Sequence, residues 1–246
     1  VELVFGAEKV YDEPVTYTEK EDGTFELTAV ANRENKTEFR VEAEGKVVSS
    51  IARHPFKWDS YIETVYIGKD VKELRGETFV NLRALKNFVV DEENKYFTVE
   101  DGILFSKDMT RLLCCPMSNG MNEGEGILAK GQEGYIIPPS VQKIDADAFY
   151  YCKFPHIVLP SKLTYIDSGT FANCTNLKDI TIPANVKAIA NGAFYLCNSM
   201  ENMYFMPKTP PAMTEGLANS YINYTLKYNF YAVFLPMYVC TLFNNL

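Results

Sequence analysis

One apolar pattern recurs three times between Ile136 and Phe205 with almost constant spacing. Two aliphatic residues three positions apart are followed by Phe, then Cys, then Leu, and finally by an Ile-x-Ile-Pro step. Phe149 to Phe171 is 22 residues, and Phe171 to Phe194 is 23 residues. A fixed period of this length is typical of stacked coils, in which each unit buries its apolar side chains against its neighbours.

The copies have apolar residues at the same repeat positions, and this agreement predicts which residues form the core. The clearest copy is Leu163, Ile166, Phe171, Cys174, Leu177, Ile180, Ile182 and Pro183. Its neighbours are Val141, Ile144, Phe149, Cys152, Phe154, Ile157, Leu159 and Pro160 on one side, and Val186, Ile189, Phe194, Cys197, Met200, Met203 and Phe205 on the other. Two weaker copies come earlier: Val48, Ile51, Phe56, Ile62, Val65 and Ile67, then Val71, Leu74, Phe79, Leu82, Leu85, Phe88 and Val90. The predicted fold is a solenoid, mainly β, with short helical turns at the Phe-x-x-Cys segments.

Breaks in the pattern divide the chain. We expect a β-rich N-terminal cap at 1–38, the solenoid at 39–205 and a C-terminal cap at 206–246, because terminal coils must be covered. The Asp22-Gly23 turn signal precedes a predicted strand at Phe25–Val30.

The period is lost at 91–134, which we interpret as an insertion. Within it, Val99–Phe105 and Arg111–Cys115 are predicted to form a hairpin around Ser106–Thr110. A glycine-rich exposed loop is expected to follow at Ser118–Gly134. An insertion in a solenoid tends to lie on one face and can form part of a binding surface.

Charge and composition exclude several classes of function. The net charge of −8 and the isoelectric point near 5.0 argue against nucleic-acid binding, which needs clustered Lys and Arg. His54 and His156 are the only histidines, and the sequence has no Gly-rich phosphate loop, HExxH or CxxC. We therefore expect neither an enzyme nor a bound cofactor.

Three of the six cysteines, Cys152, Cys174 and Cys197, occupy one repeat position. A metal site or a disulfide is one interpretation of this column. The favoured interpretation is buried thiols that act as small apolar plugs, because stacked side chains point in parallel and Leu82 fills the same position in an earlier coil. Adjacent Cys114 and Cys115 are expected on opposite faces of a strand.

The coil from Leu163 to Pro183 strongly resembles the BspA-like, or treponemal-type, leucine-rich repeat. Asp101–Phe105 with Lys107 and Leu112 resembles a hairpin often inserted between coils of that family. The resemblance covers roughly 39–236. It implies an exported or surface-attached bacterial protein that binds proteins or adheres to hosts, without catalytic activity.

Side-chain alternation in each strand predicts which residues face away from the core. One outward row holds Tyr66, Val89, Val158, Thr181 and Tyr204, and the row beside it holds Thr64, Asn87, His156, Asp179 and Asn202. The first row is either an apolar strip that binds a partner or a consequence of β-propensity alone. We weigh the two interpretations evenly and take both rows as the candidate binding surface.

No metal site and no membrane span are expected. The opening Val1–Glu8 is too short and too acidic for a signal peptide, so we expect a mature or trimmed chain. Tyr228–Leu246 is uncharged and near the spanning length, but Pro236 and its asparagines argue against insertion.

The sequence therefore predicts a non-catalytic module that binds a protein or a glycan as a monomer, at or outside a bacterial cell surface. The alternative is a structural spacer in a larger envelope protein or assembly, with no ligand of its own.

Overall fold

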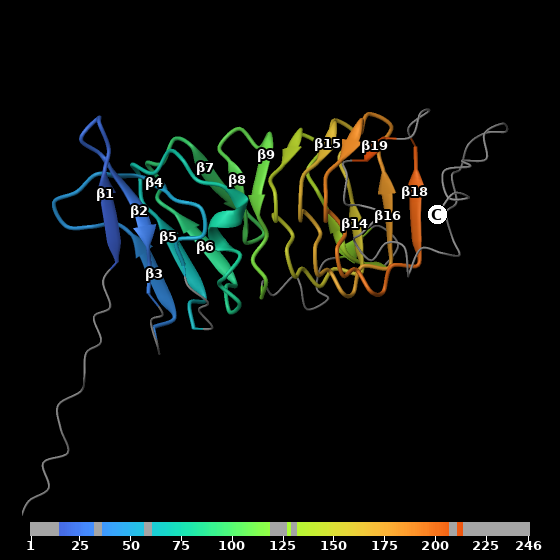
Figure 1. Ribbon diagram of the computed structural model, residues 1–246, viewed down its shortest axis with the longest axis horizontal. Helices are drawn as coiled ribbons and strands as arrows, with labels where there is room; N and C mark the ends of the chain where they lie inside the picture. The colour runs from blue at the N-terminus through green and yellow to red at the C-terminus, as the bar shows by residue number, and fades with distance from the viewer. Residues whose placement is uncertain are drawn as a thin grey trace, which may run out of the picture.

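The chain forms a β-solenoid of about seven turns. The computed structural model describes residues 15–31, 36–56, 61–118, 127–128, 132–206 and 211–213. In Figure 1 the strands lie side by side along the long axis, from β1 at one end to β18 at the other. This confirms the predicted solenoid. The expected C-terminal cap falls almost entirely on residues outside the described ranges, as do Tyr228–Leu246 and Cys240.

Two parallel sheets carry the longer strands of the coils. The N-terminal parallel sheet has the order β3-β5-β6 and the C-terminal parallel sheet has the order β12-β14-β16-β18. The first contains β3 (Glu38–Val41), β5 (Thr64–Ile67) and β6 (Asn87–Val90); the second contains β12 (Tyr135–Ile136), β14 (His156–Val158), β16 (Asp179–Ile182) and β18 (Asn202–Phe205). Parallel pairing of successive coils follows from the constant period, because each strand meets the same position one repeat later.

Further strands form other sheets among the described residues. One sheet consists of β1 (Thr16–Glu19), β2 (Phe25–Ala29) and β4 (Val48–Ile51). Another consists of β15 (Tyr165–Ile166), β17 (Ala188–Ile189) and β19 (Ala212–Met213). A third is the pair of β10 (Ile127–Leu128) and β11 (Gln132–Glu133). β1 and β2 are an antiparallel hairpin whose turn includes Gly23 at φ 76°. The predicted Asp22-Gly23 turn and the strand after it are confirmed, whereas the capping role of this segment remains a prediction.

The expected helical turns are mostly absent from the described residues. One 3₁₀-helix, η1 (Gly76–Phe79), is present, and the equivalent Phe-x-x-Cys segments are isolated turns. In the coil at 163–183, Cys174 donates its amide to the carbonyl of Phe171, and Leu177 donates to Cys174. Turns that are joined end to end in this way do not give the overlapping hydrogen bonds of a helix.

The described strands between residues 97 and 114 of the central insertion lie inside the stack. β7 (Phe97–Glu100), β8 (Ile103–Ser106) and β9 (Arg111–Cys114), here called the partition strands, join β13 (Lys143–Ile144) in one sheet of order β13-β9-β8-β7. β8 and β9 form the predicted hairpin, but the expected strand at Val99–Phe105 is broken by a turn at Asp101-Gly102. β8 and β9 are mostly buried on both faces, so these two strands offer little surface to a partner, and a binding role for the rest of the insertion remains a prediction.

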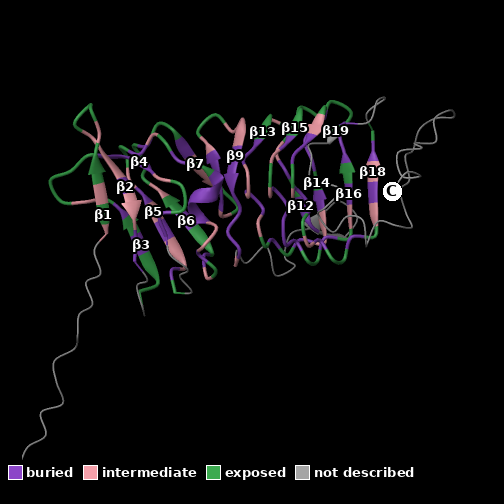
Figure 2. Ribbon diagram, in the orientation of Figure 1, coloured by how far each residue is buried: buried purple, intermediate pink, exposed green. Residues whose placement is uncertain are grey.

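The partition strands divide the hydrophobic core in two. Ile103, Phe105 and Leu112 pack with the C-terminal coils, whereas Leu104 and Leu113 pack with the N-terminal coils. Cys114 and Cys115 also face opposite halves of the core, as the sequence predicted. Figure 2 shows the region around β9 and η1 as mostly buried.

The residues that the repeat assigned to the core are buried. Phe171 and Leu177 are fully enclosed, and the corresponding residues of the neighbouring coils are all buried as well. In the coil at 71–90, Val90 alone among the assigned positions is partly exposed. The 22- to 23-residue period therefore identified the core correctly.

Candidate functional surfaces

Four outward side chains line up across the C-terminal parallel sheet. Ile136 pairs with Val158, and Thr181 pairs with Tyr204, in the register of the parallel strands. The side chains of Ile136 and Val158 are 50% and 47% exposed, Thr181 is exposed, and Tyr204 is half-buried. We call Ile136, Val158, Thr181 and Tyr204 the C-terminal strip.

Ile136 was missed as a member of this row. Tyr135-Ile136-Ile137-Pro138 is a degraded strand-and-proline step, with Tyr135 at the position that Ile157 holds in the next coil. The spacing of the prolines could have revealed this copy of the repeat, because Pro138, Pro160 and Pro183 are 22 and 23 residues apart. The aromatic Tyr135 in place of an aliphatic residue concealed the repeat.

Polar residues border the C-terminal strip on the same strands. His156, Asp179 and Asn202 are aligned on β14, β16 and β18. His156 Nδ1 lies 2.9 Å from Asp179 Oδ2, and both residues are half-buried. The second predicted row is therefore a polar margin in which two neighbours are already paired.

The remaining predicted site residues lie on a different sheet. Thr64, Tyr66, Asn87 and Val89 belong to the N-terminal parallel sheet, where Tyr66 is in register with Val89. The side chain of Val89 is 43% exposed. The partition strands separate the two sheets in the chain, so the ten predicted residues form two groups and not one continuous ladder.

Tyr66 is largely covered by its own sheet. The Arg40 guanidinium carbon lies 3.8 Å from the centre of the Tyr66 ring, and the Tyr66 hydroxyl donates to Glu38 Oε1 at 3.2 Å. A cation over an aromatic face stabilises the pair modestly at an exposed site. The ring is therefore less available to a partner than strand alternation alone suggested.

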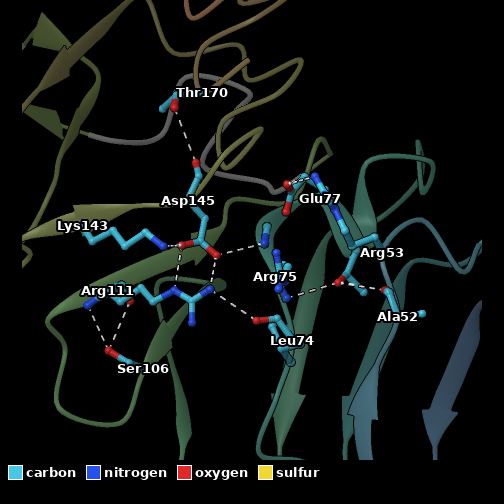
Figure 3. Close-up of polar contacts among 12 residues, drawn as sticks. Ala52, Arg53, Leu74, Arg75, Glu77, Ser106, Arg111, Lys143, Asp145 and Thr170 are labelled. Atoms are coloured by element: carbon cyan, nitrogen blue, oxygen red, sulfur yellow. Dashed lines mark hydrogen bonds and ion pairs between the residues drawn. The ribbon is translucent and has the colours of Figure 1, made fainter. Parts of the chain in front are cut away.

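A charged groove of about 640 Å³ lies where the N-terminal coils meet β9 and β13. Asp145, whose side chain is 3% exposed, is the central acceptor (Figure 3). Its carboxylate accepts from Arg111 Nε at 2.7 Å and Nη2 at 2.5 Å, and from the Gly76 amide at 3.1 Å. Arg111 also reaches the carbonyl of Leu74 at 3.4 Å. A buried carboxylate is tolerated here because its oxygens are satisfied by charged and backbone donors.

Most of the cations in this groove are neutralised within the protein. Lys143 Nζ lies 3.4 Å from Asp145 Oδ1, and Arg53 Nη2 lies 2.7 Å from Glu77 Oε1. Pairing of this kind leaves little net charge to attract an ionic ligand. We therefore interpret the groove as a structural junction between the two halves of the solenoid.

Asp147 lies beside this groove in an unusual environment. Its pKa is raised to about 6, mainly by burial and also by the nearby carboxylates of Glu77 and Asp167, against the opposing effects of His54 and Arg53. Its backbone has φ 56°, a left-handed conformation that is uncommon outside glycine. The raised pKa and the left-handed backbone of Asp147 affect stability and do not by themselves form a catalytic site.

The five described cysteines are buried, and none of them is in a disulfide. Cys174 Sγ donates to the carbonyl of Phe149 at 3.0 Å, and Cys197 Sγ donates to that of Phe171 at 3.1 Å. Two of the three thiols of the predicted column, Cys174 and Cys197, therefore bond to the preceding coil. Among the described residues no group of three or more His, Cys, Asp or Glu is arranged to hold a metal ion. Within the same residues, no helix has the length and apolar character required to cross a bilayer.

The fold has counterparts among solved structures. A leucine-rich repeat protein from Eubacterium ventriosum has a TM-score of 0.57 at 20% identity, over 78% of this chain and 47% of that one. The T. pallidum leucine-rich repeat protein has a TM-score of 0.47 at 18% identity, over 81% of this chain and 83% of that one. The pneumococcal vaccine antigen PcpA has a TM-score of 0.48 at 20% identity, over 68% of this chain and 50% of that one. The chain spans about half the length of the first and third of these proteins.

Sequence comparison places the repeat in a family. No curated protein sequence matches this chain significantly. Residues 131–227 match the family model described as "BspA type Leucine rich repeat region (6 copies)". This range includes the three coils with the clearest pattern, whose strands form the C-terminal parallel sheet. Residues 131–227, a little under half of the chain, are therefore similar to the BspA-type leucine-rich repeat.

Proposed function

We propose that the chain is a non-catalytic module that binds a protein partner through the C-terminal strip. The observation that carries this proposal is the pair Ile136 and Val158, two aliphatic side chains that are about half exposed and adjacent in register. Tyr204 extends the same row, and His156, Asp179 and Asn202 supply a polar margin. An apolar centre with a polar rim is the usual composition of a protein interface.

A protein partner suits this surface better than a glycan. Two of its four residues are exposed aliphatic side chains, and its one aromatic ring, Tyr204, is half-buried. Its backbone is held by parallel pairing, on both sides in β14 and β16 and on one side in the edge strands β12 and β18. The side chains are therefore largely ordered before binding and lose little entropy. The BspA-type repeats support a place at or outside a bacterial cell surface, where such a partner would be a surface or host protein.

The test is a binding screen with a matched pair of variants. The purified chain is titrated against extracellular-matrix proteins and glycans, beside the double variant Ile136→Thr/Val158→Thr. Threonine keeps the β-branched shape that strands favour, so the fold should be retained. We expect the double variant to weaken binding of a protein partner at least about tenfold, which is roughly 1.4 kcal/mol.

The matched control is Val89→Thr, which changes a similarly exposed valine on the N-terminal parallel sheet. Binding of the partner should be unchanged in this variant. Equal binding by wild type and the double variant would contradict the assignment to the C-terminal strip. Saturable binding of glycans alone would replace the protein partner with a glycan, and no binding across the panel would favour a spacer.

A further inference from the structure

Cys115 and Cys152 are brought together by the central insertion. Cys115 follows β9, one of the partition strands, and Cys152 belongs to the first coil after the insertion. Both side chains pack in the C-terminal half of the core, and each is almost fully buried. Their Sγ atoms are 3.1 Å apart, with the Cys152 thiol donating to the Cys115 sulfur.

This contact departs from the pattern of the cysteine column. Cys174 and Cys197 each donate to a phenylalanine carbonyl one coil earlier, at 3.0 Å and 3.1 Å. The insertion occupies the place of the coil before Cys152, so the same thiol position meets a sulfur atom and not a carbonyl oxygen. The contact between Cys115 and Cys152 therefore arises where the partition strands meet the first C-terminal coil.

The geometry points to a disulfide. A disulfide has a sulfur–sulfur distance of about 2.05 Å, so the two Sγ atoms must approach by about 1 Å, a movement within the reach of side-chain rotation. We propose that Cys115 and Cys152 form a disulfide when the chain folds under oxidising conditions, and that this bond fastens the partition strands to the first C-terminal coil.

The oxidant is a low-molecular-weight disulfide such as oxidised glutathione. One cysteine attacks it as the thiolate, forms a mixed disulfide and releases one glutathione thiolate. The thiolate of the other cysteine then attacks the protein sulfur and releases the second glutathione thiolate. The two glutathione thiolates take up the two protons that the cysteines lost. Two cysteine thiols are thus oxidised, and one molecule of oxidised glutathione is reduced to two of glutathione.

Burial decides when this exchange takes place. In the folded chain burial raises the pKa of the Cys152 thiol, which suppresses the reactive thiolate. Exchange is therefore expected during folding, before the coil closes over the two sulfurs. Once formed, the bond is shielded from reductants for the same reason.

Successive side chains at β9 point to opposite faces of the sheet, and this alternation determines which cysteine meets Cys152. Cys114 faces the N-terminal half of the core, and Cys115 faces the C-terminal half with Cys152. The expected cross-link therefore joins Cys115 and not its neighbour. It closes the segment 115–152 into a loop.

The first test is peptide mapping of the full chain, refolded in a mixture of oxidised and reduced glutathione. Remaining thiols are blocked under denaturing conditions before digestion with trypsin, which should leave peptide 112–130 linked to peptide 144–153. We expect four titratable thiols in place of the six present in the reduced chain. Six thiols after refolding, or Cys152 linked to any other cysteine, would overturn the proposal.

Variants separate the two neighbouring cysteines and do not depend on a binding assay. Cys114→Ser and Cys174→Ser should keep the cross-link, whereas Cys115→Ser should abolish it. Closing a loop of this size predicts that the melting temperature of the oxidised protein exceeds that of the reduced protein by on the order of 10 °C. The difference should vanish in Cys115→Ser, and a similar difference in Cys115→Ser and wild type would contradict a bond at this site.

Discussion

At the scale of single residues, one repeat position requires a left-handed backbone. Asp147, Gly169 and Gly192 occupy it in successive coils, with φ values of 56°, 63° and 68°. Glycine adopts this conformation without steric cost, whereas aspartate is strained. Asp147 also places its carboxylate directly over Gly169, in the space that a Cβ atom there would fill. The Asp147 carboxylate can thus occupy its position only because residue 169 in the next coil is a glycine.

The raised pKa of Asp147 predicts a pH dependence of stability. Its folded pKa of about 6 lies above the ordinary value of 3.8. The folded state therefore binds this proton more tightly than the unfolded state does. The resulting contribution to the free energy of unfolding is fully present below about pH 4 and is lost as the pH rises through about 6. Allowing for solvent screening, the loss should be about 1–2 kcal/mol.

Asp147→Asn should remove this loss. We expect the variant to be more stable than wild type at pH 7 and closer to it at pH 4, measured by urea denaturation at both values. Many groups titrate in this range, so the relevant quantity is the difference between variant and wild type. A difference that is the same at both pH values would show that Asp147 has an ordinary pKa.

Gly169→Ala should be more damaging than Gly192→Ala. Both substitutions put a Cβ atom on a left-handed backbone, at a cost of about 1 kcal/mol. At Gly169 the Cβ also collides with the Asp147 carboxylate, whereas at Gly192 the nearest atom, Tyr195 Cβ, is 3.9 Å away. We expect the free energy of unfolding to fall by about 2–3 kcal/mol and about 1 kcal/mol respectively. Equal losses would mean that the carboxylate moves aside freely.

At the scale of elements, the coils are joined by a column of phenylalanine rings. Phe171 stacks between Phe149 and Phe194, with ring centres 5.4 Å and 5.3 Å apart and interplanar angles of 23° and 13°. The strands on either side are short, so this packing and the parallel pairing must together hold the coils in register. Such stacked pairs contribute beyond the apolar area that they bury.

Phe171→Ala should lower the free energy of unfolding by about 3–5 kcal/mol, because the surrounding coils cannot collapse into the space left by the ring. Phe171→Leu keeps most of the volume and should cost less than half as much. Chemical denaturation measures both losses. A near-zero effect of the alanine variant would be inconsistent with this register.

At the scale of the whole molecule, the partition strands make one solenoid from two cores. The Asp145 carboxylate joins Arg111 of β9 to the amide of Gly76, which is 69 residues away in sequence. Gly76 is required there, since a Cβ atom would strike the carbonyl of Leu113 at 2.6 Å. The junction thus combines a charge cluster with close backbone packing.

Asp145→Ala should lower the free energy of unfolding by about 3 kcal/mol, because it leaves a partly buried guanidinium and a buried amide without their acceptor. The matched control is Lys86→Ala, which breaks an exposed 2.9 Å ion pair with Glu63 and should cost less than about 1 kcal/mol. Hydrogen exchange should show faster opening of β9 and η1 in the Asp145 variant alone. Unchanged exchange there would argue against a structural role for the junction.

The period was sufficient to predict the solenoid, its core positions and the outward direction of residues such as Val89 and Val158. It could not show that Tyr66 lies beneath Arg40, because that contact depends on a neighbouring strand that carries no clear copy of the repeat. It also placed Tyr66 and Tyr204 in one row, although they lie on separate sheets. Local pattern predicts the direction of a side chain, but not what covers it.

The sequence by itself determined everything that repeats: the coil length, the phenylalanine and cysteine columns and the alternation of the strands. These follow from the spacing of side chains along a regular backbone. Only the tertiary structure decided that β8 and β9, from the aperiodic part of the chain, enter the stack and divide the core. It likewise decided that Cys115 meets Cys152 and that Asp145 reaches Gly76. Such contacts depend on the path of the chain between coils, which no periodic signal records.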